Sequence, residues 1–175
     1  PPLRAVIGLL WWTGARPAEV LGLRSDQIDT TTTPWCAELE DHKAAGYGRA
    51  RVLFFGPRCR EILTPWLRPD GGYLFQPVEA VSAHYQRLRG ARKTPLWPSH
   101  EAHQEAKRAR RGRQRFGKTY SSASLLQAVR RAAQRAGVEP WEVYSLRHAA
   151  AARLRRELDL DAARTTLGHS AASMT

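Results

Sequence analysis

Two arginines and one histidine in this sequence could together bind a single phosphate group. Arg16 lies in the segment TGARPAEVLGLR, Arg147 in YSLRHAAAARL, and His169 in LGHSAASMT. If these three side chains met at one point, they would form a cationic site for a phosphodiester. Such donors stabilise the extra negative charge of a pentacovalent transition state. The residue types therefore favour phosphoryl-transfer chemistry, although a lone histidine after a helix-ending glycine is more often a helix cap.

The surroundings of Arg16 leave two interpretations open. Arg16 lies between Gly14 and Pro17, in a corner between two predicted helices, and Glu19 follows one helical turn later. An arginine near a helix start opposes the helix dipole, so it needs an acidic partner. Arg16 could form a salt bridge with Glu19 that closes the corner. Alternatively, it could face a phosphate while Glu19 or nearby backbone fixes its orientation.

The net charge of the chain favours a polyanionic partner. Its 28 Lys and Arg residues outnumber 16 Asp and Glu residues, which gives a net charge of +12. Nucleic acid is the first candidate, because cationic side chains release its condensed counterions. Arginine outnumbers lysine, and guanidinium can grip two phosphate oxygens, although a high-GC coding bias accounts for part of this excess. A membrane surface is the rival partner, but the longest apolar stretch, AVIGLLWW, is too short to span a bilayer.

A run of basic residues concentrates this charge in one segment. Its members are Lys107, Arg108, Arg110, Arg111, Arg113, Arg115 and Lys118. The run could be a solvated loop or a surface that contacts the DNA backbone. The charge excess of the whole chain favours DNA contact.

Other classes of site find little support in the sequence. Cys36 and Cys59 are interpreted as small core residues. His100 and His103 are three residues apart, whereas the zinc-protease motif needs a spacing of four on a helix, so we predict no metal site. No Gly-rich phosphate loop with a lysine is present, and we expect neither a cofactor nor a small-molecule substrate. No signal peptide is visible, so we expect a cytoplasmic, nucleoid-associated protein.

The elements that must position these residues are mostly helical. Apolar spacing and capping residues predict helices over 3–13, from 17, over 57–67, 77–90, 121–136, from 145 and over 161–167. Two strands, WCAELE and RARVLFFG, are joined by the loop AAGYG and predict an antiparallel hairpin. Residues 91–118 lack a lasting apolar period and are interpreted as a long, basic, partly mobile connection. The expected fold is α+β, mainly helical, with one small antiparallel sheet in a single domain spanning residues 1–175.

The segments TGARPAEVLGLR, LRHAAAARL and LGHSAASMT, in this order and spacing, resemble the catalytic domain of the tyrosine recombinase (phage integrase) family. The resemblance extends from about Thr13 to Thr175 and implies the DNA breaking-rejoining fold. It implies that Arg16 and Arg147 bind the scissile phosphate. Glu19 takes the acidic position that supports the first arginine.

The resemblance also assigns roles at two further positions. Lys43 lies near the hairpin turn, where the family keeps the lysine that protonates the departing 5′ oxygen. By itself Lys43 is an ordinary loop lysine, and its neighbour His42 is a weaker candidate for the same proton. His169 matches a histidine that contacts the phosphate or steadies the nucleophile.

The sequence departs from the family's pattern beside the second arginine. Three residues before Arg147 the family often has histidine, whereas this chain has Tyr144. A phenol with a pKa of about 10 is a poor general base at neutral pH, but it can donate a hydrogen bond to a phosphate oxygen. Tyr144 therefore stays a candidate site residue. His148, directly after Arg147, is expected to pack or bond locally.

The nucleophile is the second departure. The family places its attacking tyrosine about nine residues beyond the histidine matched by His169, where it forms a covalent link to DNA. The printed sequence has six residues after His169, so we expect the attacking phenol to be missing from residues 1–175 and the domain to be incomplete there. The family's N-terminal DNA-clamping domain is also expected to be missing. Four tyrosines stand in segments that do not fit the role: Tyr47, Tyr73, Tyr85 and Tyr120.

The function that the resemblance implies is site-specific recombination of double-stranded DNA through a 3′-phosphotyrosyl intermediate. Neither ATP nor a divalent metal is required, because the covalent linkage conserves the bond energy. The family assembles as a tetramer on DNA, so other recombinase protomers are expected partners. Two rivals remain: a truncated integrase remnant that binds DNA without cleaving it, and a type IB topoisomerase. The segment TGARPAEVLGLR argues against the topoisomerase.

Overall fold

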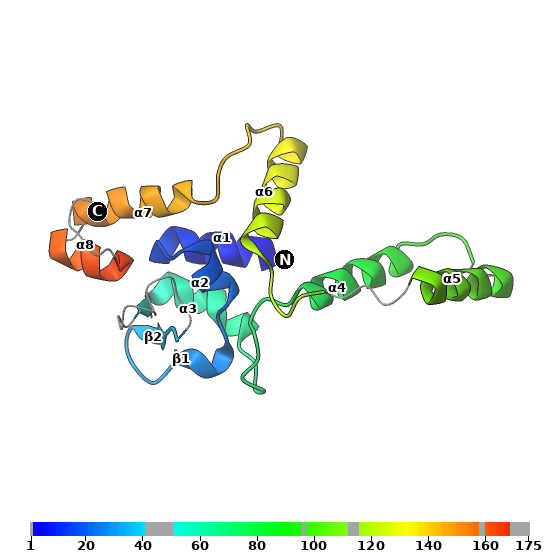
Figure 1. Cartoon of the computed structure of the whole chain (residues 1–175), viewed down its shortest axis with the longest axis horizontal. Helices are drawn as coiled ribbons and strands as arrows, with labels where there is room; N and C mark the ends of the chain where they lie inside the picture. Colours follow the sequence, from blue (N-terminus) through cyan, green and yellow to red (C-terminus); the bar gives the residue numbers. More distant parts are fainter. Residues whose placement is uncertain (1, 41–50, 96, 112–115, 158–159, 169–175) are drawn as a thin grey trace. The chain divides into compact units, whose positions relative to one another are not determined.

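The computed structural model of the chain describes residues 2–40, 51–95, 97–111, 116–157 and 160–168 (Figure 1). The chain divides into two compact units. Unit 1 comprises Pro1–Phe75 and Tyr120–Thr175, and unit 2 comprises Gln76–Thr119. Unit 2 is therefore inserted into the sequence of unit 1. The prediction of a single domain over residues 1–175 did not include this division into two units.

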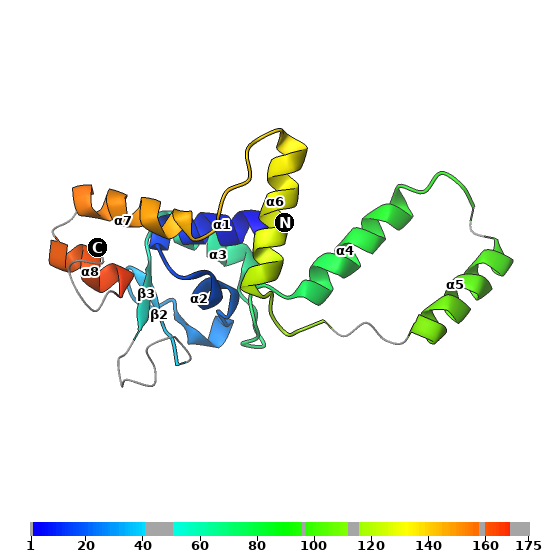
Figure 2. The same cartoon turned by 45° about the horizontal axis from the view of Figure 1, so that its top comes forward.

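Unit 1 is built mainly from helices. Its α-helices are α1 (Pro2–Thr13), α2 (Pro17–Leu21), α3 (Pro57–Leu63), α6 (Ser122–Ala136), α7 (Ser145–Glu157) and α8 (Leu160–Leu167). Two short 3-10 helices are η1 (Ser25–Gln27) and η3 (Thr64–Trp66). Helix α1 lies among the others in both views and packs against α2, α3, α6 and α7 (Figure 2).

The core of unit 1 follows from the apolar spacing of α1. Val6, Leu9 and Leu10 recur at helical spacing, and all three are fully buried. Helices α7 and α8 add a second cluster, formed by Ala151, Leu154, Ala163 and Leu167. This second cluster packs the end of α8 against α7, which carries the predicted site residues Arg147 and His148.

A three-stranded antiparallel sheet completes unit 1. Its strands are β1 (Ile28–Asp29), β2 (Trp35–Glu38) and β3 (Val52–Phe55), in the order β1-β2-β3. In the register, Trp35 pairs with Phe55 and Glu38 pairs with Val52. The predicted antiparallel pairing of these two strand segments is confirmed, while the two-residue strand β1 was not foreseen.

Capping residues explain the boundaries of α6. The Ser121 hydroxyl accepts a hydrogen bond of 3.1 Å from the backbone N–H of Ser124, which satisfies one free donor at the helix start. Gly137 ends the helix in the left-handed conformation, with φ of 66°. The observed helix agrees with the prediction of a helix over 121–136.

Unit 2 corrects one prediction. It contains α4 (Pro77–Gly90), which was predicted, and α5 (Pro98–Arg111), which lies inside the segment interpreted as an irregular connection. The interpretation rested on the missing apolar period, but α5 is a polar helix rich in Ala, Glu, Gln, Lys and Arg, all strong helix formers. None of the helices in the described ranges is long and apolar enough to cross a membrane.

Gly14 joins α1 to the α7–α8 pair and gives a test of this packing. It has φ of 64°, and an added Cβ would lie 2.6 Å from Leu167 Cδ2 and 3.1 Å from Ala150 Cβ. Gly137 has φ of 66°, but no atom lies within 4 Å of an added Cβ, so it provides a matched control.

We predict that Gly14→Ala lowers the free energy of unfolding by about 2–4 kcal/mol, which combines left-handed strain with overpacking. Gly137→Ala is expected to cost only the strain, about 1–2 kcal/mol. Urea denaturation of both variants measures the difference. Equal losses would show that Leu167 does not pack closely against Gly14.

Candidate active site

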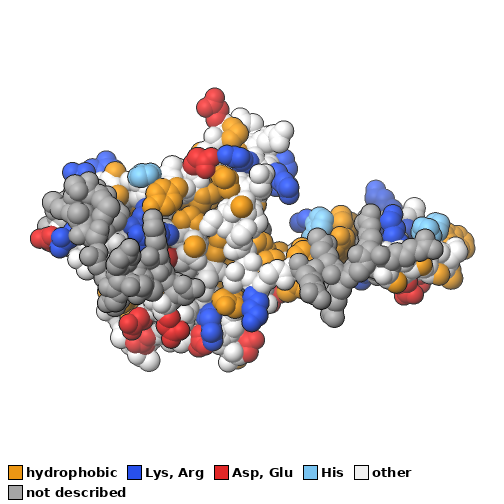
Figure 3. Space-filling model, in the orientation of Figure 1, with side chains coloured by type: hydrophobic (Ala, Val, Ile, Leu, Met, Phe, Trp, Pro, Cys, Tyr) orange, Lys and Arg blue, Asp and Glu red, His pale blue; other side chains and the backbone are white. Residues whose placement is uncertain are grey.

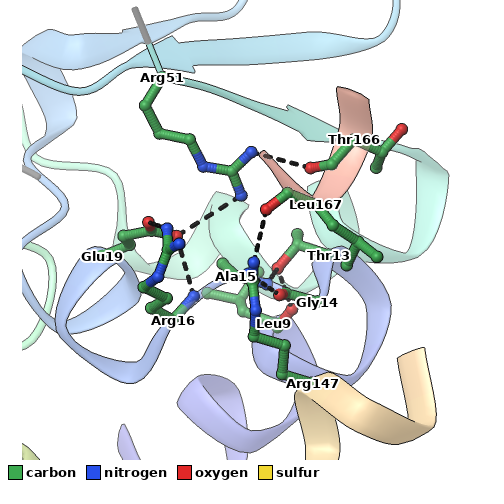
Figure 4. A network of polar contacts seen from close by, with 10 residues as sticks. All are labelled: Leu9, Thr13, Gly14, Ala15, Arg16, Glu19, Arg51, Arg147, Thr166 and Leu167. Carbon is green, nitrogen blue, oxygen red and sulfur yellow. Dashed lines mark hydrogen bonds and ion pairs between the residues drawn. The ribbon is translucent and has the colours of Figure 1, made fainter. Parts of the chain in front are cut away.

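Arg147 is a buried arginine that joins two helix ends. It lies in the first turn of α7 and is 4% exposed. Its Nη1 donates to the carbonyl oxygen of Gly14 at 2.7 Å, and its Nη2 donates to that of Leu167 at 2.6 Å (Figure 4). The guanidinium therefore links the chain just after α1 to the last residue of α8.

Arg16 and Glu19 close the corner before α2. Arg16 is the N-cap residue, and its backbone N–H donates to Glu19 Oε2 at 2.9 Å. Its Nη1 also donates to Glu19 Oε1 at 2.7 Å. The salt bridge foreseen from the sequence is present, yet 25% of the Arg16 side chain stays exposed, against 4% for Glu19. Both interpretations of Arg16 are therefore compatible: Glu19 fixes the side chain, and part of the side chain still faces solvent.

Arg51 is a third arginine in this cluster, and sequence reasoning missed it. It directly precedes β3, and its side chain is 5% exposed. Its Nη2 lies 3.5 Å from Glu19 Oε2, and its Nη1 donates to the carbonyl oxygen of Thr166 at 2.9 Å. The available signal was strand alternation, because Arg51, Leu53 and Phe55 are all buried at a spacing of two.

The charges in this cluster do not balance locally. Burial raises the pKa of the Glu19 carboxyl, but the charge of Arg51 and the hydrogen bonds from Arg16 outweigh this effect, so the pKa lies below its ordinary value. Burial lowers the pKa of Arg147, and the nearby charge of Arg16 lowers it further. Burial likewise lowers the pKa of Arg51, although Glu19 partly offsets this. Three guanidinium groups thus share one carboxylate, an arrangement that can attract an anion.

Tyr144 and His148 lie at the start of the same helix as Arg147. Tyr144 is 48% exposed, and its ring meets the His148 ring edge-on, with centroids 5.3 Å apart and planes at 70°. The contact gives His148 a local packing partner. It leaves the Tyr144 side chain largely accessible to a ligand.

The remaining predicted site residues divide into three groups. Outside the described residues lie Lys43, His42, His169, Arg113 and Arg115. A second group belongs to α5 but has side chains that the structure does not describe: Arg108, Arg110 and Arg111. Lys107 and Lys118 are exposed residues of unit 2. Figure 3 shows Lys and Arg side chains at several places on the surface. In the described part of the chain, no three His, Cys, Asp or Glu side chains form a group suited to a metal ion.

The depressed pKa of Glu19 gives a prediction with a defined sign. We expect Glu19→Gln to lower the free energy of unfolding at neutral pH by about 3 kcal/mol, because two arginines then lose their buried counter-ion. A carboxyl whose pKa is lowered on folding stabilises the folded state fully at pH values above its unfolded pKa of about 4.3. This stabilisation is lost as the pH falls through the pKa of the folded state. Urea denaturation at about pH 7 and at successively lower pH values therefore should show the gap between variant and wild type closing in acid.

Glu61→Gln is the matched control for this experiment. Glu61 pairs with Arg58 at 3.3 Å, but both side chains are more than 60% exposed. An exposed pair contributes about 0–1 kcal/mol, so the control should remain close to wild type. A loss in Glu19→Gln that stayed constant with pH would contradict the predicted role of the charge.

Comparisons with known proteins give the cluster its context. No curated protein matches the chain. Among solved structures, the XerH site-specific recombinase bound to difH substrate is 18% identical, with a TM-score of 0.58, over 99% of this chain and 41% of its own. XerA recombinase is 17% identical, with a TM-score of 0.56, over 98% of this chain and 49% of its own. The Tn1549 transposon integrase in complex with transposon right end DNA is 14% identical, with a TM-score of 0.54, over 97% of this chain and 51% of its own.

These likenesses confirm the predicted fold class, a mainly helical domain with a small antiparallel sheet. This chain spans about half the length, or less, of the three structures. The family model whose description is "Phage integrase family" matches residues 2–175, which confirms the resemblance noted in the sequence. Since this match covers nearly the whole chain, the chain belongs to the phage integrase family.

Proposed function

We propose that this chain is the catalytic domain of a tyrosine recombinase that cuts and rejoins DNA through a 3′-phosphotyrosyl intermediate. The observation that carries the proposal is the meeting of Arg16 and Arg147 at the turn between α1 and α2. Arg147 donates to the Gly14 carbonyl, and Arg16, two residues later, is the N-cap of α2. Two guanidinium groups from distant parts of the chain are thereby held close enough for one charge to lower the pKa of the other.

In this proposal the two arginines bind the scissile phosphate. Arg16 presents its exposed portion while Glu19 fixes its direction, so little side-chain entropy is lost when the phosphate arrives. Arg147 uses two of about five N–H donors on carbonyl oxygens, which leaves others for phosphate oxygens. Tyr144, which is half-exposed, can donate a further hydrogen bond from its hydroxyl.

The proton and covalent steps fall on residues that only the resemblance assigns. Lys43 is the proposed general acid for the departing 5′ oxygen, and His169 is proposed to contact the phosphate or steady the nucleophile. The attacking phenol would come about nine residues after His169, beyond the printed sequence. Positive charge from Arg16 and Arg147 then stabilises the transition state in the place of a metal ion.

Double-stranded DNA is the proposed substrate and partner. The structure of the Tn1549 transposon integrase is described as a complex with transposon right end DNA, and that of XerH as bound to difH substrate. The net charge of +12 supports the same kind of partner for this chain. Assembly of protomers into a tetramer on DNA, and location with the nucleoid in the cytoplasm, follow as parts of the proposal.

We expect Arg16→Ala to slow covalent capture at least about 100-fold, because one preorganised phosphate donor is lost. The assay uses the full-length protein and a nicked duplex that carries its own recombination site. Arg58→Ala is the matched control, since Arg58 is an exposed, ion-paired arginine on α3. Wild-type protein that binds this duplex but forms no adduct would identify a DNA-binding remnant instead.

Unit 2 is the proposed site of DNA-backbone contact. Residues 76–119 hold 11 of the 28 Lys and Arg residues, but only 3 of the 16 Asp and Glu residues. Both of its basic side chains that the prediction named and the structure describes, Lys107 and Lys118, are exposed. Exposed cations without an ordered role in the fold can neutralise phosphates at low cost to stability.

Neutralising these two lysines gives a quantitative test. We expect Lys107→Gln combined with Lys118→Gln to weaken duplex binding and reduce the slope of log K against log salt by about 2, or about 1 for each lost phosphate contact. Fluorescence anisotropy over a range of salt concentrations measures this slope. Arg58→Gln again serves as the control, and an unchanged slope in the double variant would mean that these lysines do not contact DNA.

A further inference from the structure

Arg51 is a buried arginine that uses only part of its hydrogen-bonding capacity on the described residues. Its side chain is 5% exposed, and within the described part of the chain two of its buried nitrogens, Nε and Nη2, have no hydrogen-bond partner. Its acidic neighbour Glu19 already accepts two hydrogen bonds from Arg16. Glu19 thus has two cationic partners, since the nearby charge of Arg51 also lowers its pKa. A buried ion pair of this kind is often matched or exceeded in stability by apolar residues of similar volume, so fold stability alone does not account for Arg51.

The two contacts of Arg51 lead to two different parts of the proposed phosphate site. On one side, Nη2 lies 3.5 Å from Glu19 Oε2, the atom that also accepts from the Arg16 backbone. On the other side, Nη1 donates at 2.9 Å to Thr166 O, in the last turn of α8 (Figure 4). One rigid guanidinium thus connects the carboxylate behind Arg16 with the end of α8.

Gly168 shows how closely Arg51 determines the end of α8. An added Cβ at Gly168 would lie 2.7 Å from Arg51 Nη1, 3.0 Å from Cζ and 3.1 Å from Cδ. Gly168 also has φ of 65°, a left-handed conformation that ends the helix. The guanidinium therefore lies directly against the backbone of the residue that precedes His169.

We propose that Arg51 is a positioning residue of the phosphate site, acting on Arg16 through Glu19 and on the chain that leads to His169 through Thr166 and Gly168. This inference rests on the proposed function, because it assumes that Arg16 binds phosphate. The two contacts of the Arg51 guanidinium described above are to protein groups, the Glu19 carboxylate and the Thr166 carbonyl, so we assign its effect to these neighbours.

Phosphate affinity of the folded protein tests this role. The probe is inorganic phosphate, titrated into the full-length protein while NMR follows the Arg16 Nε–H signal, which is identified by its loss in Arg16→Lys. We expect Arg51→Met to weaken phosphate binding by about tenfold, because a displaced donor loses its alignment. Arg51→Lys should recover part of the loss, since it keeps the charge beside Glu19 but cannot bridge to Thr166 at the same time.

Arg58→Met is the matched control, because Arg58 is exposed and pairs with Glu61 on the surface of α3. It should bind phosphate as the wild type does. Thermal unfolding of each variant identifies the temperature range where the protein is folded, and affinities are compared only there. A purely structural Arg51 would lower the unfolding temperature of Arg51→Met without changing the affinity of the folded protein.

The outcomes separate this inference from the proposed function. Wild-type binding at Arg16 together with equal affinity in Arg51→Met would overturn the positioning role and leave the phosphate site intact. A wild-type Arg16 signal that does not respond to phosphate would overturn the phosphate site, and the role of Arg51 with it. Weaker binding in Arg51→Met with partial recovery in Arg51→Lys supports both.

Discussion

The end of α8 is held by two buried guanidinium groups, and the rest of the site depends on this contact. Thr166 O accepts from Arg51, and Leu167 O accepts from Arg147. The last carbonyls of a helix have no partner within the helix and carry the negative end of its dipole, so cations are favourable there. Because Arg51 precedes β3 and Arg147 begins α7, these two bonds tie the sheet and α7 to one helix end.

The same contact brings like charges together. Arg16, Arg51 and Arg147 share Glu19 as their nearby carboxylate, and the pKa of both buried arginines is lowered. The fold supplies backbone carbonyls in place of further acidic side chains. These carbonyls accept hydrogen bonds from the arginines without cancelling their positive charge. An excess of positive charge is costly to an empty site and favourable to a site that receives a phosphodiester. Conflict between stability and charge of this kind is common where a protein binds an ionic ligand.

Local signals in the sequence were enough for most of the fold. Helices α1 and α6 were predictable because their apolar spacing, Gly14, Ser121 and Gly137 act within a few residues of each other. Helix α5 was missed because its sequence has helix propensity without an apolar face. Among the site residues, Arg16 and Glu19 were predictable because they are one turn apart. Arg51 was missed because its contacts lie far away in the chain, and a buried arginine is recognised only once its partners are placed.

The two glycines beside these contacts give a physical reason for the segments TGAR and LGH. Gly14 and Gly168 both end helices with positive φ, a task that Gly137 performs without a close neighbour. Here each also provides room: a Cβ at Gly14 would meet Leu167, and a Cβ at Gly168 would meet the Arg51 guanidinium. Since Arg147 must reach the carbonyls of both Gly14 and Leu167, those helix ends have to approach within the length of one guanidinium group. The glycines therefore serve the approach of helix ends and arginines, and the ending of each helix is the smaller part of their role.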